Sequence, residues 1–218
     1  GESGVIDVAK QGAILVDMSS IDPMVSIEIS AELAKKGIHM LDAPVSGGEP
    51  KAIDGSLSIM VGGDREIFDR VKSILLCMGS SVVLVGKIGS GNVTKLSNQI
   101  IVALNIAAMC EAYILASKAG VDIEKVYDAI KGGLAGSVVL DAKTPKILAR
   151  NFNPGFRINL HIKDLNNVMD SASKLGLELP LSKAVLDMMK ALDDKGVAGD
   201  DHSGLIKYYE NLNNYVIE

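Results

Sequence analysis

The longest helical pattern in the chain runs from Gly89 to Gly120, with no proline and with no glycine between Gly91 and Gly120. At about 1.5 Å per residue, a helix of this length extends roughly 45 Å. Residues 100–110 are apolar on nearly every side of such a helix, which predicts burial by neighbours all round. The unbroken apolar run is shorter than the roughly 20 residues that a membrane span needs, so no span and no membrane partner is predicted. The chain is therefore predicted to be organised around one long buried helix.

Before this helix, short apolar segments alternate with helical patterns. A connection with a short helix occupies residues 1–12. Strands are predicted at 13–18, 38–45, 56–61 and 81–85, and helices at 24–36 and 64–77, the second with Asp64 as its N-cap. Alternation of strands and helices is typical of an α/β sheet.

After the long helix, only helical patterns follow. They cover residues 122–131, 138–149, 160–174, 181–192 and 203–212, and glycines and prolines separate them. The sequence therefore predicts two parts. Residues 1–88 form an α/β domain, and residues 89–218 form the long connecting helix and an all-α domain.

Composition and charge narrow the function classes. The 218 residues carry a net charge of −5, which argues against a nucleic-acid surface. Cys77 and Cys110 lie in apolar settings and are interpreted as reduced core thiols, which together with the lack of a signal peptide favours the cytoplasm. The three histidines, His39, His161 and His202, have no cysteine or carboxylate at metal-ligand spacing, so no metal site is predicted.

The first turns of the long helix carry a polar cluster. Lys95, Asn98 and Gln99 stand at i, i+3 and i+4 and therefore share one face of the helix. A lone lysine near a helix start is more often solvated than functional. An ammonium aligned with two amides on an otherwise apolar helix, however, indicates a binding or catalytic site.

Three motifs resemble those of the β-hydroxyacid dehydrogenases, in the order and spacing of that family. They are Asp42–Gly48 (DAPVSGG), Gly91–Asn98 (GNVTKLSN) and Lys163–Leu165 (KDL). The resemblance covers essentially the whole chain. It implies the C-terminal part of a Rossmann-like dinucleotide-binding domain, a helical second domain and a homo-oligomer. It also implies reversible hydride transfer between NAD(P)H and a small aldehyde that bears a carboxylate.

The segments NQIIVALNIAAMCEA, GGLAGSVVLDAK and NPGFRINLHIKDL are most similar to the family branch that reduces tartronate semialdehyde to glycerate. Branches that act on 3-hydroxyisobutyrate or succinic semialdehyde are alternatives. A catalytically inactive assembly module is the alternative from outside the enzymes. NAD and NADP both remain open as cofactor.

The resemblance also implies roles for individual residues around the substrate. Ser46 and the backbone N–H groups of Gly47 and Gly48 bind the substrate carboxylate, where glycine lets the backbone approach closely. Lys95 is the general acid in reduction and the base in oxidation, and its ammonium stabilises a developing alkoxide. Either Asn98 or Gln99 hydrogen-bonds the substrate or holds the lysine.

The resemblance places the nicotinamide against two other regions. Ser19, at the end of the first strand, is expected to contact the cofactor, and so is the segment with Phe156, Lys163 and Asp164. Without the resemblance, the Lys163–Asp164 pair is most simply a surface ion pair of small energetic consequence. Phe156 could equally be a core residue.

The glycine fingerprint with which family members open, Gly-x-Gly-x-x-Gly, is not found in the chain. The resemblance therefore predicts that about 75 residues, the first half of the dinucleotide-binding domain, are missing and that the chain alone binds cofactor weakly or not at all. Residues 89–94 with Glu111 imitate such a fingerprint but lack its third glycine and a following strand, so we do not predict a phosphate site there. The neighbours Asp201, His202 and Ser203 are interpreted as a helix cap, not as a catalytic triad.

Overall fold

The computed structural model describes residues 4–217 and divides the chain into two compact units, Gly1–Asn98 and Gln99–Glu218. The division falls inside helix α5 (Ser90–Lys118), whose first turns belong to the first unit. The predicted opening segment, 1–12, lies partly outside the described residues. Its described part contains the short helix α1 (Val5–Val8).

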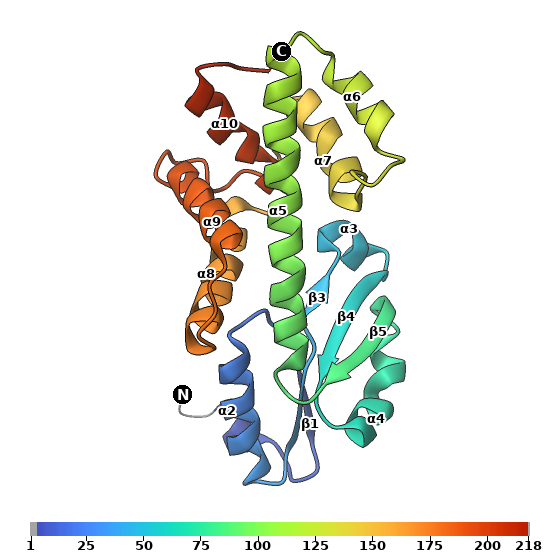
Figure 1. Ribbon diagram of the computed structural model, residues 1–218. Helices are drawn as coiled ribbons and strands as arrows, with labels where there is room; N and C mark the ends of the chain where they lie inside the picture. The colour runs from blue at the N-terminus through green and yellow to red at the C-terminus, as the bar shows by residue number, and fades with distance from the viewer. Residues whose placement is uncertain (1–3, 218) are drawn as a thin grey trace. The chain divides into compact units, whose positions relative to one another are not determined.

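A mixed sheet forms the centre of the first unit (Figure 1). Its strands are β1 (Ile14–Asp17), β2 (His39–Asp42), β3 (Val45–Ser46), β4 (Leu57–Gly62) and β5 (Gly79–Gly86). β1 pairs with β2 in parallel and β4 pairs with β5 in parallel, whereas β2 and β3 both run antiparallel to β4. The predicted α/β class is confirmed, and the antiparallel pairs are an addition that the alternating pattern did not predict.

The predicted strand at 38–45 is wrong in one respect, because it is two strands. The ladder of β2 ends at Asp42, and β3 starts only after Pro44. A proline has no N–H to donate to a sheet, although the Pro44 carbonyl accepts a hydrogen bond from Met60 N at 3.1 Å. A short helix, α3 (Gly48–Ile53), follows directly and was not predicted.

Helices α2 (Pro23–Ala34) and α4 (Arg65–Leu75) cover opposite faces of this sheet (Figure 1). Successive side chains of a strand point to opposite faces. Accordingly, Leu41 of β2 packs in one cluster with Phe68 of α4, while Met40 packs in another with Leu33 of α2. The predicted N-cap is confirmed, since the Asp64 carboxylate accepts from Glu66 N at 2.8 Å and from Ile67 N at 3.1 Å.

Helix α5 is confirmed as one unbroken helix, but the prediction of burial on all sides is wrong. Ile101, which lies within residues 100–110, is 60% exposed. Among the described residues, α5 is also the one helix that is long and apolar enough to cross a membrane, with a mean hydropathy of 1.9 in its most apolar window, although the predicted run length argued otherwise. Length and composition are weak evidence, because core helices pass the same test. The Tyr113 hydroxyl, which is buried, shares a hydrogen bond of 2.6 Å with Thr144 of the second unit's core.

The second unit is helical, as predicted. Its remaining helices are α6 (Ile123–Ile130), α7 (Val138–Leu148), α8 (Ile158–Lys174), α9 (Pro180–Asp193), the 3-10 helix η1 (His202–Leu205) and α10 (Ile206–Asn213). α8 packs along α9, α6 packs against α7, and η1 contacts α7, α8 and α9. The predicted last helix, 203–212, is thus two elements, and the first of them joins three others.

The two cysteines differ in their exposure to solvent. Cys110 is buried in α5, where burial raises the pKa of its thiol well above the usual range. Cys77 is exposed, so its interpretation as a core thiol is wrong. It lies beyond the end of α4, whose buried positions stop at Leu75.

Candidate functional site

A buried carboxylate fixes the start of α5 in the first unit. Asp42, the last residue of β2, is fully buried and accepts hydrogen bonds from Gly89 N at 2.8 Å and from Asn92 N at 2.7 Å. A Cβ at Gly62 or Gly91 would collide with Asp42, so both glycines make room for this contact. The first turn of the helix is therefore attached to the carboxyl end of a strand.

Asn92 connects the same turn to the loop after β1. Its side chain is fully buried; Oδ1 accepts from Ile21 N at 3.1 Å, and Nδ2 donates to Ser26 Oγ at 3.1 Å. Asn92 N already donates to Asp42. A single residue of α5 thus joins β2, the β1–α2 loop and α2.

Lys95 follows Asn92 by three residues and so projects from the same face, one turn further along α5. Only 6% of Lys95 is exposed, which contradicts the alternative of a solvated lysine. Asn98, another turn on, is partly buried. The Asp42 and Asn92 contacts therefore set the part of the helix that carries the proposed acid.

The segment predicted to bind a carboxylate forms a tight turn. Ser46 ends β3 opposite Ser58 of β4, and Gly47 and Gly48 follow with φ of +140° and +67°. These angles favour glycine, and both glycines are exposed. The turn therefore presents its main chain to solvent directly after the strand.

Ser19 lies in an exposed loop at the carboxyl end of β1. Ser19 N donates to Asp17 Oδ1 at 3.0 Å, and Asp17 stands opposite Asp42 in the parallel β1–β2 ladder. Ligands of α/β proteins bind outside the carboxyl ends of parallel strands. Ser19 and Asp42 thus mark the same edge of the sheet.

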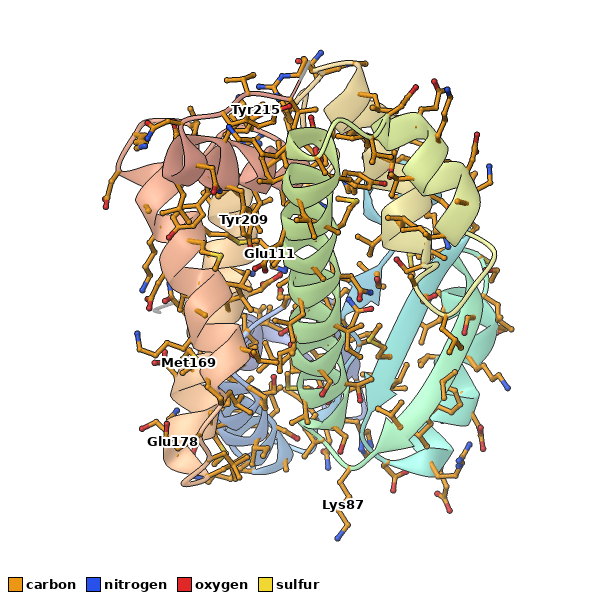
Figure 2. The ribbon with its side chains drawn as sticks, turned by 45° about the horizontal axis from the view of Figure 1, so that its top comes forward. Lys87, Glu111, Met169, Glu178, Tyr209 and Tyr215 are labelled. Carbon is orange, nitrogen blue, oxygen red and sulfur yellow. The ribbon has the colours of Figure 1, made fainter. Side chains whose placement is uncertain are left out.

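The turn at residues 89–94 was not predicted to bind phosphate, and the structure gives a physical reason for that interpretation. N–H groups at a helix start attract anions. Here those of Gly89 and Asn92 already donate to Asp42. Glu111, the acidic residue of the imitated fingerprint, lies far along α5 itself and is exposed (Figure 2).

In the second unit, Gln99 of α5 and Asp164 of α8 are joined. Gln99 Nε2 donates to Asp164 Oδ2 at 2.6 Å, and both residues are at most 4% exposed. Asp164 Oδ1 lies 3.0 Å from Lys163 Nζ, but no described group gives it a well-aligned hydrogen bond. The interpretation of Lys163–Asp164 as a plain surface pair is therefore wrong for the aspartate, whereas the lysine side chain is 50% exposed.

An aromatic cluster surrounds the same region of the second unit. The ring centroids of His161 and His202 lie 5.2 Å apart, and Phe156 lies 5.7 Å from the first and 5.4 Å from the second. The two Nδ1 atoms of the histidines are 3.1 Å apart, and His161 Nε2 lies 3.1 Å from the Gln99 carbonyl oxygen. The partly buried Phe156 ring thus contacts the buried histidines.

Asp201 makes the largest number of the polar contacts described around this cluster. Its fully buried carboxylate lies 3.0 Å and 3.1 Å from Lys143 Nζ, and it accepts from the N–H groups of Gly155, Phe156 and Ser203. Burial acts to raise the pKa of Asp201, but the Lys143 charge and the other donors outweigh it and hold that pKa well below its usual range. The predicted cap is confirmed, since Asp201 is the N-cap of η1.

The same surroundings act on His202. Burial, the Lys143 ammonium and the His161 ring lower the pKa of His202 well below its usual range, although Asp201 acts in the opposite direction. The imidazole is therefore neutral at neutral pH.

The sequence interpretation missed several residues of these networks. Asp42 stood inside a quoted motif without a role, and Asn92, His161, Lys143 and Asp201 had no functional interpretation. Asp42 follows a strand directly and precedes the glycine turn, which is a signal that could have been used. The histidine contact joins positions 41 residues apart and had no such signal.

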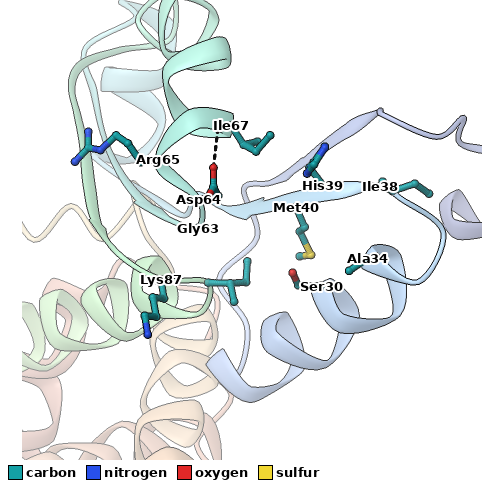
Figure 3. Close-up of a pocket in the computed structure, with 11 residues that line it drawn as sticks. Ser30, Ala34, Ile38, His39, Met40, Gly63, Asp64, Arg65, Ile67 and Lys87 are labelled. Carbon is teal, nitrogen blue, oxygen red and sulfur yellow. Dashed lines mark hydrogen bonds between the residues drawn. The ribbon is translucent and has the colours of Figure 1, made fainter.

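A separate cavity of about 420 Å³ lies in the first unit between α2, β2 and the start of α4 (Figure 3). Arg65 and Lys87 lie at one end of it, and Ala34 and Ile38 lie at the other. None of the motif residues lines it, so we do not include it in the candidate site. Among residues 4–217 no cluster of three or more His, Cys, Asp or Glu side chains could hold a metal ion.

Two family models match the chain in sequence. The NAD-binding domain of 6-phosphogluconate dehydrogenase matches residues 1–86, and the model described as NAD-binding of NADP-dependent 3-hydroxyisobutyrate dehydrogenase matches residues 89–209. The second covers more than half of the chain. The chain belongs to the β-hydroxyacid dehydrogenase family, related to 3-hydroxyisobutyrate dehydrogenase. It is thus an NAD(P)-dependent oxidoreductase by family.

Individual relatives support the same family assignment. The 2-hydroxy-3-oxopropionate reductase of Escherichia coli is 43% identical over 215 residues, which are 99% of this chain and 74% of that protein. A probable 3-hydroxyisobutyrate dehydrogenase-like protein of Arabidopsis thaliana is 36% identical over the whole chain and 65% of its own length. The Mycobacterium tuberculosis 3-hydroxyisobutyrate dehydrogenase structure with L-serine matches with a TM-score of 0.87 at 29% identity, over 93% of this chain and 72% of that one.

Proposed function

We propose that this dehydrogenase reduces tartronate semialdehyde to glycerate with NAD(P)H. Support for the substrate comes from the 43% identity to a 2-hydroxy-3-oxopropionate reductase. The compound 2-hydroxy-3-oxopropionate is tartronate semialdehyde. The observation that carries the mechanism is the buried Lys95, one turn after a helix start that Asp42 attaches to the sheet.

The chain supplies three functions to the reaction. Ser46 and the N–H groups of Gly47 and Gly48 bind the carboxylate of the substrate. The Lys95 ammonium gives its proton to the carbonyl oxygen as the carbonyl carbon is reduced, and its charge stabilises the developing alkoxide. Because the Gln99 amide already donates to Asp164, we propose Asn98 for the substrate and Gln99 for holding α8.

The residues present fit a nicotinamide cofactor. Ser19 lies outside the carboxyl ends of parallel strands, and Asp164 Oδ1 is a buried acceptor to which no described group donates a well-aligned hydrogen bond. Ser19, Phe156, Lys163 and Asp164 would hold the cofactor, and the reduced cofactor supplies the hydride when it is bound. We also propose a homo-oligomer in the cytoplasm, on the resemblance to the family.

A panel of aldehydes tests the substrate. Tartronate semialdehyde, the semialdehyde of 3-hydroxyisobutyrate and succinic semialdehyde are compared by kcat/KM with NADH and with NADPH. Tartronate semialdehyde is expected to give the highest value, and Lys95→Met is expected to lower it by about 10²–10⁴. A higher value for the 3-hydroxyisobutyrate semialdehyde would favour the activity for which two of the relatives are named.

The assembly-module alternative needs a separate measurement. NADH and NADPH are titrated by calorimetry into the chain as printed and into the longest form that its gene encodes. Binding by either form supports an enzyme. If neither form binds a cofactor, the chain acts in assembly, and Lys95 has no catalytic role.

A further inference from the structure

Gln99 is attached to α8 at two points within the second unit. Its side chain donates to Asp164 Oδ2, and its main-chain carbonyl oxygen contacts His161 Nε2. His161 and Asp164 are three residues apart and thus lie on one face of α8. One turn of α8 therefore holds both the backbone and the side chain of one residue of α5.

The protonation states of the two histidines follow from their partners. A carbonyl oxygen only accepts, so the 3.1 Å contact to Gln99 requires a hydrogen on His161 Nε2. In a neutral ring, His161 Nδ1 is then an acceptor, and the 3.1 Å contact between the rings requires a hydrogen on His202 Nδ1. The donors therefore run in one direction, from His202 to His161 to Gln99.

His202, at the far end of this chain of donors, is held by several contacts. His202 N donates to the Phe156 carbonyl at 2.9 Å, and Asp201, which precedes it, binds two N–H groups of the segment before α8. The Phe156 ring lies against both imidazoles. His202 is thus held by its backbone and by ring contacts while it orients His161.

We propose that His161 and His202 are positioning residues of this dehydrogenase, which fix Gln99 and Asp164 through one directed pair of hydrogen bonds. This inference rests on the proposed function, because Gln99 and Asp164 belong to the candidate site. Neither histidine needs to touch the substrate or the cofactor. The pair sets where α8 holds Asp164 and Lys163 relative to Gln99.

The geometry allows the pair only one extra proton. A hydrogen added at His161 Nδ1 would face the hydrogen of His202 Nδ1 across 3.1 Å and break the contact. A proton at His202 Nε2 leaves the contact intact. The directed arrangement therefore requires His161 to stay neutral.

Nitrogen-15 NMR of histidine-labelled protein tests the arrangement without any assay of activity. At pH 7.5 we expect His161 as the Nε2–H tautomer and His202 as the Nδ1–H tautomer. His161 as the Nδ1–H tautomer, or with both nitrogens protonated, would overturn the proposal.

Two variants of His202, one that keeps the donor to His161 and one that removes it, test the positioning role. An asparagine amide imitates the Nδ1 side of histidine, so His202→Asn keeps the donor to His161, whereas His202→Leu removes it. We expect His202→Leu to lower kcat about tenfold with less than about a twofold change in the cofactor KM, and His202→Asn to restore most of the loss. His39→Asn is the matched control, because His39 is exposed on β2 of the first unit.

The outcomes are distinguishable. Equal losses in His202→Leu and His202→Asn would overturn the proposal, because the ring would then matter only for packing. Unchanged kinetics in both would overturn it as well. If the wild-type protein reduces none of the aldehydes, the proposed function fails, while the NMR measurement still decides whether the directed pair exists.

Discussion

The candidate residues of the two units are held by different chemistry. In the first unit, Asp42 and Asn92 bind mainly backbone N–H groups, and neither contact involves a histidine. In the second unit, the corresponding contacts run through Lys143, Asp201 and two buried histidines. In the second unit, Asp201 also accepts from backbone N–H groups, but contacts between pairs of side chains are added to these. The difference teaches that the helix start before Lys95 is held mainly by contacts to the main chain, whereas the segment around α8 is held in addition by an ion pair and a pair of histidines.

The largest effect is expected at the ion pair of the second unit. Asp201→Asn leaves the mostly buried Lys143 ammonium without its counter-charge, which should lower the free energy of unfolding by about 3–5 kcal/mol at pH 7.5. Chemical denaturation measures it. Adding Lys143→Met to Asp201→Asn removes the unpaired charge and should recover about 2 kcal/mol. Simple addition of the two single losses would contradict this account of the second unit.

In the first unit, Asp42→Asn is expected to cost somewhat less. In either orientation of the amide, one of the N–H groups of Gly89 and Asn92 faces another donor, which should lower the free energy of unfolding by about 2–3 kcal/mol. Asp17→Asn is the matched control at the paired position of β1, where the amide oxygen can still accept from Ser19 N. An equal loss in both variants would show that the contact to α5 is not the cause.

Much of the fold could be predicted, because its signals are local. The alternating strands and helices, the long helix and the Asp64 cap each depend on neighbouring residues. The short helix α3 was missed, since a stretch with two glycines and Pro50 lacks a helical pattern. The split of one strand at Pro44 was missed although the residue was visible.

The residues of the candidate site also fall into those that local sequence signals indicate and those that they do not. The motif around Ser46 and Lys95 is contiguous in sequence and could be quoted from it. The contact between Gln99 and Asp164 joins residues 65 positions apart, and that between the histidines joins residues 41 apart. No period or spacing encodes such a pair, because it exists only once the helices have packed.

Acidification is expected to destabilise the second unit through His202. The pKa of His202 is lowered in the folded chain, so below about pH 6.5 the unfolded chain binds the proton first and stability falls as the pH falls. The slope for one proton is at most about 1.4 kcal/mol per pH unit. Lys143, Lys146 and His161 oppose protonation of His202, and Asp201 favours it.

Thermal or chemical unfolding between pH 7.5 and 5.5 checks this sign. His202→Asn, which cannot titrate, should lose less stability on acidification than the wild type does. His39→Asn, at an exposed histidine of β2, is the matched control for the removal of an imidazole. If the His202 variant retained the full slope, the pH dependence would have to come from another group.

The smallest effect is expected in the first unit, where the Asn92 side chain is joined to α2. Ser26→Ala removes the acceptor of Asn92 Nδ2 but leaves Asn92 Oδ1 bound to Ile21 N, so the free energy of unfolding should fall by only about 1 kcal/mol. Ser30→Ala is the control, one turn further along α2 at the wall of the cavity in Figure 3. Ser26 orients the Asn92 amide, and the same amide accepts from Ile21 N in the loop that carries Ser19, so cofactor affinity should weaken by a few fold in Ser26→Ala. An unchanged cofactor affinity in Ser26→Ala would show that the loop keeps its position without this hydrogen bond.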